Sequence, residues 1–105
     1  MVKHIVLFQL KVELPAETRS KVATDFKVGI EKLPAVIPFI RQIEVGFNIN
    51  SDETWDICLN ATFDTLDDVR AYAVHPSHTA VAGALKPYLS GRSCVEYTAH
   101  HRQQR

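Results

Sequence analysis

Apolar and polar side chains follow two different periods along this chain, and the order of those periods predicts the fold. Residues 2–12 are rich in β-branched and aromatic side chains on both alternations, which indicates a strand covered on both faces. Residues 15–33 carry apolar side chains at helical spacing, with charged residues between them: Val22, Phe26, Ile30 and Leu33. We therefore expect an amphipathic helix that Pro34 ends.

The middle of the chain has the period of two that is typical of strands. Apolar side chains occupy every second position from Ile43 to Ile49, and again from Trp55 to Phe63. The polar run INSDET between them is typical of a turn. These two segments are therefore predicted to pair as a hairpin.

Two further helices and a last strand are expected in the second half. Thr65 followed by Asp68 is a variant of the capping box, and it opens a short helix. Pro76 is typical of the first position of another helix, and Pro87 is expected to kink or end that helix early. The segment RSCVEYTA predicts the final strand.

The order strand, helix, strand, strand, helix, strand is the α+β, ferredoxin-like βαββαβ pattern. We expect one domain over residues 1–99, with a four-stranded antiparallel sheet, helices on one face, and a tail at 100–105 that frays. The first and third strands each have apolar side chains to hide, so we predict a homodimer formed through the open sheet face. The usual strand order (fourth, first, third, second) puts Cys58 about 9–10 Å from Cys94, beyond disulfide reach.

Charge and composition narrow the choice of partners. Twelve Lys and Arg balance twelve Asp and Glu, which argues against nucleic acid and anionic membranes, since both select for a basic excess. No segment approaches the ~20 apolar residues that span a bilayer, and the first residues lack a signal-peptide pattern. The two separated cysteines fit a reduced compartment. We therefore expect a cytoplasmic protein that binds neither nucleic acid nor membrane.

The best candidate for chemistry is the segment YAVHPSH, which contains Tyr72, His75, Pro76 and His78. Tyr72 falls at the end of one helix and His78 in the first turn of the next, where the helix dipole favours a neutral imidazole that can act as a base. The same side chains could instead satisfy backbone groups freed at the helix break, and spacing alone favours that structural role. His75 and His78 lack a nearby third ligand, so no metal and no other cofactor is predicted.

Two further polar features lie on predicted strands. His4 is a polar residue among apolar ones. Its position alone predicts that its ring is half exposed or hydrogen-bonded to a neighbour. In the strand predicted from Trp55 to Phe63, the even-numbered side chains are polar: Asp56, Cys58, Asn60 and Thr62. Burial without partners would be costly for these groups, whereas a wet cleft or solvent would accommodate them. The sequence does not choose between the cleft and solvent.

These segments together resemble the stress-responsive dimeric α/β barrel domain family, often called Dabb. The resemblance runs from VKHIVLFQLK, through LPAVIPFIRQIEVGFN and ATFDTLDDVRAY, to the HPSH box and the closing SCVEYT. It implies the ferredoxin-like fold and a dimer whose two sheets form a central barrel. Most members have no assigned activity, so the resemblance is more informative about fold than about function.

The plant polyketide cyclases of this family imply roles for individual residues. Their acid/base Tyr and His, which act in an intramolecular aldol closure, correspond to Tyr72 and His78, and a cleft His of the first strand corresponds to His4. A second cleft His corresponds to Asp56, and an aromatic residue that closes the pocket corresponds to Phe26. Because Asp56 changes the charge of the cleft, the cyclase reaction itself is not expected to transfer.

Three functional hypotheses remain. The first is a dimer that binds a small apolar or aromatic carbonyl compound between sheet and helices; if it is catalytic, His78 acts as base and Tyr72 as its orienter or as the electrophile, without a cofactor. The predicted ligand-binding residues are His4, Val6, Phe8, Phe26, Asp56 and Cys58. The second is a non-enzymatic dimer that binds a ligand or contributes to stress tolerance. The third is an oxygenase of the wider barrel superfamily, although no axial heme ligand stands out.

Overall fold

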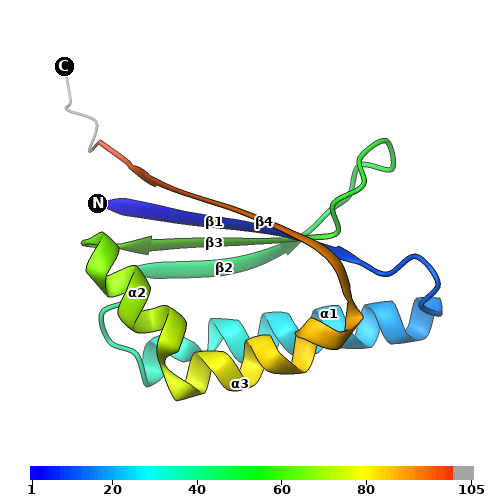
Figure 1. Cartoon of the computed structure of the whole chain (residues 1–105), viewed down its shortest axis with the longest axis horizontal. Helices are drawn as coiled ribbons and strands as arrows, with labels where there is room; N and C mark the ends of the chain where they lie inside the picture. Colours follow the sequence, from blue (N-terminus) through cyan, green and yellow to red (C-terminus); the bar gives the residue numbers. More distant parts are fainter. Residues whose placement is uncertain (101–105) are drawn as a thin grey trace.

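Four antiparallel strands form one sheet in the order β2-β3-β1-β4 (Figure 1). The strands are β1 (Val2–Leu10), β2 (Gln42–Phe47), β3 (Ile57–Phe63) and β4 (Leu89–Thr98). The structure, a computed structural model, describes residues 1–100. Apart from residue 100, the predicted frayed tail lies outside the described residues. The strand order is the one expected from the sequence.

The helices lie together on one side of the sheet (Figure 1). They are α1 (Ala16–Glu31), α2 (Leu66–Val74) and α3 (Pro76–Leu85), with short 3₁₀ turns η1 (Leu33–Ala35) and η2 (Lys86–Tyr88). The loop between β2 and β3 projects to the opposite side of the sheet (Figure 1). This arrangement is the predicted α+β, ferredoxin-like βαββαβ fold.

The even-numbered side chains of β1 form the inner face of the sheet, which is the face under the helices. His4, Val6, Phe8 and Leu10 are all buried, whereas the odd-numbered residues between them are only half-buried. Strand pairing sets Ala61, Leu59 and Ile57 of β3 beside His4, Val6 and Phe8. Since cross-strand partners share a face, the apolar alternation of β3 also lies under the helices.

The open face is therefore less apolar than the sequence predicted. The apolar alternation of β3, which was expected to add to the bare face, is buried, and Cys58, Asn60 and Thr62 lie on the open side instead. The physical reason is the pairing register. Because side chains alternate along a strand, the register that turns Ile57, Leu59 and Ala61 inward necessarily turns Cys58, Asn60 and Thr62 outward. The apolar part of the open face belongs to β1 and β4: Ile5, Leu7, Val95 and Tyr97.

Local signals in the sequence explain most element boundaries. The Thr65 hydroxyl accepts a hydrogen bond from the Asp68 backbone N–H at 3.1 Å, as predicted for a cap. α3 ends at Leu85, just before Pro87, and gives way to η2. β4 then begins at Leu89, earlier than expected from the sequence, because its N-terminal part pairs with Gln9 and Leu10.

Two other expectations concern cysteines and membranes. Cys58 and Cys94 are both free thiols, as the predicted strand order requires. Among the helices of residues 1–100, none has the length and apolar content needed to cross a bilayer.

Candidate functional site

The break between α2 and α3 positions the predicted catalytic pair. His75 and Pro76 separate the helices; His75 has extended backbone, and Pro76 has no N–H to continue the ladder of α2. The His75 ring Nδ1 accepts a hydrogen bond from the Ser77 N–H at 3.1 Å and so caps α3. His75 therefore has a structural role, and His78 is the histidine that the break turns toward the sheet side.

His78 is held in the form of a base. Its Nδ1 lies 3.0 Å from the Ala73 carbonyl oxygen, near the end of α2. Because a carbonyl only accepts hydrogen bonds, we assign the ring proton to Nδ1, which leaves the lone pair of Nε2 free. Burial lowers the pKa of His78 below its usual value of 6.5, and the hydrogen bond to Ala73 only partly opposes this. The ring is therefore neutral at pH 7 and available to take a proton.

Tyr72 lies against His78 and carries a hydroxyl without a partner. The two ring centroids are 4.3 Å apart, and Tyr72 is 1% exposed. Its buried hydroxyl makes no hydrogen bond within the described residues. Burial raises the pKa of Tyr72 well above its ordinary value, so the phenol stays protonated. A buried, protonated and unpaired hydroxyl is a hydrogen-bond donor in search of an acceptor.

His4 completes the cluster from the strand side. Its ring lies 5.9 Å from that of Tyr72, edge to face, and its Nδ1 is 2.6 Å from Glu96 Oε2. Burial lowers the pKa of His4, and the Glu96 carboxylate offsets part of this. We therefore read the contact as a neutral imidazole that donates to a carboxylate rather than as an ion pair. Glu96, whose pKa the Cys94 thiol and His4 lower through hydrogen bonds, is ionised at pH 7.

Cys94 and Glu96 were missed by the sequence reasoning. They lie two residues apart on β4, and pairing with β1 sets Cys94 beside Val6 and Glu96 beside His4 on the inner face. The signal was present in the predicted strand order, which puts the last strand next to the first. No motif of residues close in sequence marks this cluster, because His4 and Glu96 are 92 positions apart.

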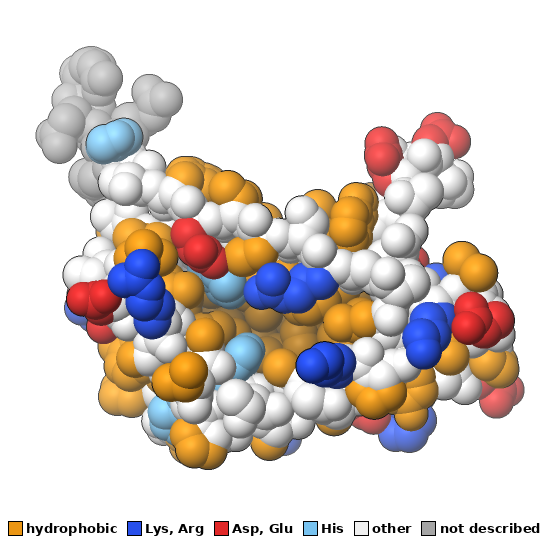
Figure 2. All heavy atoms as spheres, in the orientation of Figure 1, with side chains coloured by type: hydrophobic (Ala, Val, Ile, Leu, Met, Phe, Trp, Pro, Cys, Tyr) orange, Lys and Arg blue, Asp and Glu red, His pale blue; other side chains and the backbone are white. Residues whose placement is uncertain are grey.

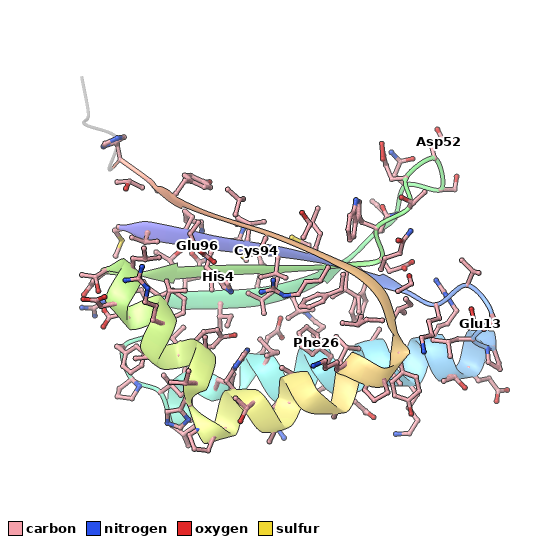
Figure 3. All side chains as sticks on the ribbon, in the orientation of Figure 1. His4, Glu13, Phe26, Asp52, Cys94 and Glu96 are labelled. Atoms are coloured by element: carbon pink, nitrogen blue, oxygen red, sulfur yellow. The ribbon has the colours of Figure 1, made fainter. Side chains whose placement is uncertain are left out.

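The cluster borders a hollow in the surface. Figure 2 shows the molecule hollowed below β4, between that strand and the helices α2 and α3, with histidine side chains in pale blue at its edge. Figure 3 shows His4, Cys94 and Glu96 gathered at the upper rim of this space. We call this space the inner cleft. His4, Cys94 and Glu96 lie at its rim, and Tyr72 and His78 join this cluster through the ring contacts of Tyr72 with His4 and His78.

The other predicted ligand-binding residues lie elsewhere. Val6, Phe8 and Phe26 are buried in the core, where the rings of Phe8 and Phe26 meet edge to face at 5.2 Å. Cys58 is on the open face, on the side of the sheet away from the helices, so its expected place in the inner cleft is wrong. The register of β3 with β1 requires this side, because Cys58 pairs with Leu7.

Asp56 is not in the inner cleft either. Its carboxylate accepts hydrogen bonds from the Leu10 N–H at 2.7 Å and from Arg19 at 3.0 Å. Leu10 is six residues along β1 from His4, which is roughly 20 Å. Asp56 therefore connects the start of α1 to the far end of β1 through hydrogen bonds. Its predicted place in the cleft, based on the match to a cleft His of the cyclases, is wrong.

Two cavities lie outside the cluster and contain some of the predicted ligand-binding residues. One of about 550 Å³ lies between α1 and α3, and Phe26 is the one predicted ligand residue in its lining. The other, of about 260 Å³, lies at the base of the β2–β3 loop beside Leu7, Trp55, Asp56 and Cys58. The predicted ligand-binding set is thus dispersed: His4 borders the inner cleft, Phe26 lines one cavity, Asp56 and Cys58 line the other, and Val6 and Phe8 lie in the core.

Comparison with known proteins places the chain in a family. The family model described as the stress-responsive A/B barrel domain, Dabb, matches residues 2–99. The chain belongs to the Dabb family. Among curated proteins none matches significantly. The family indicated by the HPSH box and the flanking strands is thereby confirmed.

Solved structures of similar fold include several described as dimers. A dimeric protein of unknown function from Bacteroides fragilis is 51% identical, with a TM-score of 0.90 over 91% of this chain and 93% of that one. A dimeric ferredoxin-like protein of unknown function from Thermobifida fusca is 28% identical, with a TM-score of 0.76 over 93% of this chain and 90% of that one.

A hydroxynitrile lyase from Passiflora edulis is a more distant neighbour of this Dabb chain. It is 16% identical, with a TM-score of 0.73 over 98% of this chain and 96% of that one. At this identity the likeness shows the fold alone, and the chemistry must be argued from the residues.

Proposed function

We propose that this Dabb protein is a homodimer that binds a small apolar or aromatic carbonyl compound in the inner cleft, where Tyr72 and His78 transfer a proton without a cofactor. The observation that carries the proposal is the Tyr72 hydroxyl, which is buried and unpaired beside a neutral imidazole. A substrate carbonyl oxygen would supply the acceptor that this hydroxyl lacks.

The division of labour follows from the two protonation states. Tyr72 keeps its proton and polarises the carbonyl as a hydrogen-bond donor. His78 Nε2 then removes a proton from the carbon next to the carbonyl, and the charge that develops on Nδ1–H is stabilised by the Ala73 carbonyl. His4 lies beside Tyr72 and orients its ring. The products are an enolate held by Tyr72 and a protonated His78.

The test is exchange of α-protons for deuterium in D₂O, followed by NMR on a panel of small aromatic and aliphatic ketones. We expect exchange above the buffer rate for some of the panel, lowered about 100-fold or more in His78→Gln and Tyr72→Phe. The matched controls are His75→Asn, which preserves the cap of α3, and Tyr97→Phe on the open face. Exchange that is equal in His78→Gln and in the unaltered protein would refute the catalytic role.

A second candidate, binding without catalysis, is favoured by the cavity between α1 and α3. Its volume of about 550 Å³ is large enough for a small ligand, and Val22, Phe26, Val81 and Leu85 make much of the lining apolar. Ligand binding that Val81→Phe abolishes and His78→Gln leaves unchanged would favour this non-enzymatic function. The reverse pattern supports the inner cleft.

The dimer is proposed to form through the open face of the sheet. Support comes from the similar proteins described as dimeric and from the apolar side chains of β1 and β4 on that face. Leu7 lies at its centre, paired with Cys58 and Ser93. Leu7→Glu should halve the mass measured by light scattering, and high salt should not. A monomeric unaltered protein, or a dimer that survives this substitution, contradicts the proposal.

A further inference from the structure

Three side chains of different ligand types meet where β1 and β4 pair on the inner face. Glu96 Oε2 lies 2.6 Å from His4 Nδ1 and 2.9 Å from Cys94 Sγ, and the sulfur lies 3.7 Å from the same ring nitrogen. Figure 3 shows the three side chains converging from the two strands. We propose that His4, Cys94 and Glu96 form a binding site for a divalent transition metal ion of the zinc type.

The strand register builds this site from distant parts of the sequence. Cys94 and Glu96 are two residues apart on β4, so both side chains point to the same face. Pairing puts Glu96 directly opposite His4 and Cys94 opposite Val6, the next inward residue of β1. All three candidate ligand atoms therefore lie within 4.8 Å of one another.

The ligand types indicate the kind of ion. Imidazole nitrogen, thiolate sulfur and carboxylate oxygen are the three protein ligands of zinc, whereas magnesium and calcium prefer oxygen ligands alone. Three protein ligands leave a fourth tetrahedral position for water or another small ligand. That position would lie toward the inner cleft, since the cluster forms its rim.

The present distances suit a metal-free, hydrogen-bonded form of such a site. Zinc bonds of about 2.0–2.3 Å at tetrahedral angles separate ligand atoms by roughly 3.4–3.6 Å. The separation of Cys94 Sγ from His4 Nδ1, 3.7 Å, already matches, and Glu96 Oε2 must move away by less than about 1 Å. On binding, Cys94 gives its thiol proton to the buffer, and His4 carries its proton on Nε2 in place of Nδ1.

Charge and access are both compatible with binding. The two anionic ligands, Cys94 thiolate and Glu96 carboxylate, balance the two charges of the ion. Arg92, which is near enough to act on all three groups, adds one opposing positive charge. Cys94 is exposed and the Glu96 side chain is 31% exposed, so an ion can enter from solvent.

The metal site shares His4 with the proposed proton transfer but needs neither Tyr72 nor His78, so the two proposals can fail separately. The measurement is accordingly binding, not turnover. Full-length protein treated with a chelator is titrated with Zn²⁺ by calorimetry and with Co²⁺ by absorption, which reports a sulfur-to-cobalt charge-transfer band when a thiolate binds. We expect one ion per chain and that band.

Variants separate this site from metal bound elsewhere. Cys94→Ser and His4→Gln should each weaken Zn²⁺ binding about 100-fold or more, and Cys94→Ser should remove the cobalt band. Cys58→Ser, which removes the thiol on the opposite face, should change neither. Glu96→Gln gives a further test if another variant loses its fold by circular dichroism. No saturable binding, or equal binding in Cys94→Ser and the unaltered protein, would overturn the proposal.

Discussion

The inner face of the sheet has two halves that differ in how far the helices cover them. In the covered half, the inward side chains of β3 are sealed: Ile57 and Leu59 are 2% exposed, and Ala61 and Phe63 are 0%. In the open half, Cys94 and Glu96 point to the same side of the sheet from β4 yet remain exposed. α1 packs against β2 and α3, so the helix layer is displaced away from β4. The polar side chains of Cys94 and Glu96 therefore lie on the part of the inner face that the helices leave uncovered.

The largest expected difference between the two halves is in how much a substitution lowers the free energy of unfolding. Leu59→Ala empties a sealed position of the covered half and should lower the free energy of unfolding by about 2–5 kcal/mol. Cys94→Ala, in the open half, should change it by less than about 1 kcal/mol. Urea denaturation at one fixed protein concentration measures both, because dimerisation adds to apparent stability. Similar losses in the two variants would contradict the division into halves.

Substitution of Asp56 is expected to have the next largest effect on stability. It tests whether this residue is a structural anchor or a part of the cleft. Asp56→Ala removes a charge-assisted hydrogen bond to the Leu10 N–H and the partner of Arg19, so we expect a loss of about 1.5–3 kcal/mol in the same urea experiment. Ketone binding, measured by NMR titration, should stay within about twofold of the unaltered protein at temperatures where the variant is folded. A large loss of binding with unchanged stability would restore Asp56 to the cleft.

Tyr72→Phe should have a smaller effect, of opposite sign. The substitution removes a buried hydroxyl that has no partner, so the ligand-free protein should keep or gain up to about 1 kcal/mol of stability. Thermal unfolding by calorimetry measures the change, and Tyr97→Phe on the open face is the matched control. A loss above about 1 kcal/mol would indicate that the hydroxyl has a structural partner.

The smallest expected effect is a dependence of stability on pH, caused by His4 and His78. Burial lowers the pKa of both His4 and His78 below 6.5, so near that pH the unfolded chain binds more protons than the folded one. Stability is therefore full above about pH 6.5 and falls as the pH drops through the folded-state values. His78→Gln should flatten this fall in urea midpoints between about pH 7 and 5. An unchanged slope would mean that His78 is not perturbed by the cleft.

The sequence predicted the fold because each element carries its own local signal. Thr65 caps α2, Pro76 starts α3, Pro87 ends it, and the period of two marks β3 as a strand. These signals depend on near neighbours and on the polarity of single positions. They also placed Tyr72 and His78 correctly at the helix break, because Pro76 fixes where that break falls.

The candidate site was only partly predictable, because it depends on register between distant strands. Glu96 meets His4 across 92 positions, and no local pattern marks that pair. The face of Cys58 was misjudged for the same reason: a strand can turn either alternation inward until its pairing is known. Asp56 was misplaced along the sheet instead, because its contacts with Leu10 and Arg19 hold it at the far end of β1. Neither the exposure of β4 nor the cavity between α1 and α3 has any local sequence signal.

We propose that the open half of the inner face is a ligand cleft built on Tyr72 and His78. The most direct measurement is NMR of ¹⁵N-labelled histidine rings during titration with small aromatic ketones and aldehydes. We expect saturable shifts of the His4 and His78 ring signals, with the His75 signals unmoved, and loss of the shifts in Tyr72→Phe. Binding that shifts the methyl groups of Val22 and Val81 while leaving both His4 and His78 unmoved would contradict it.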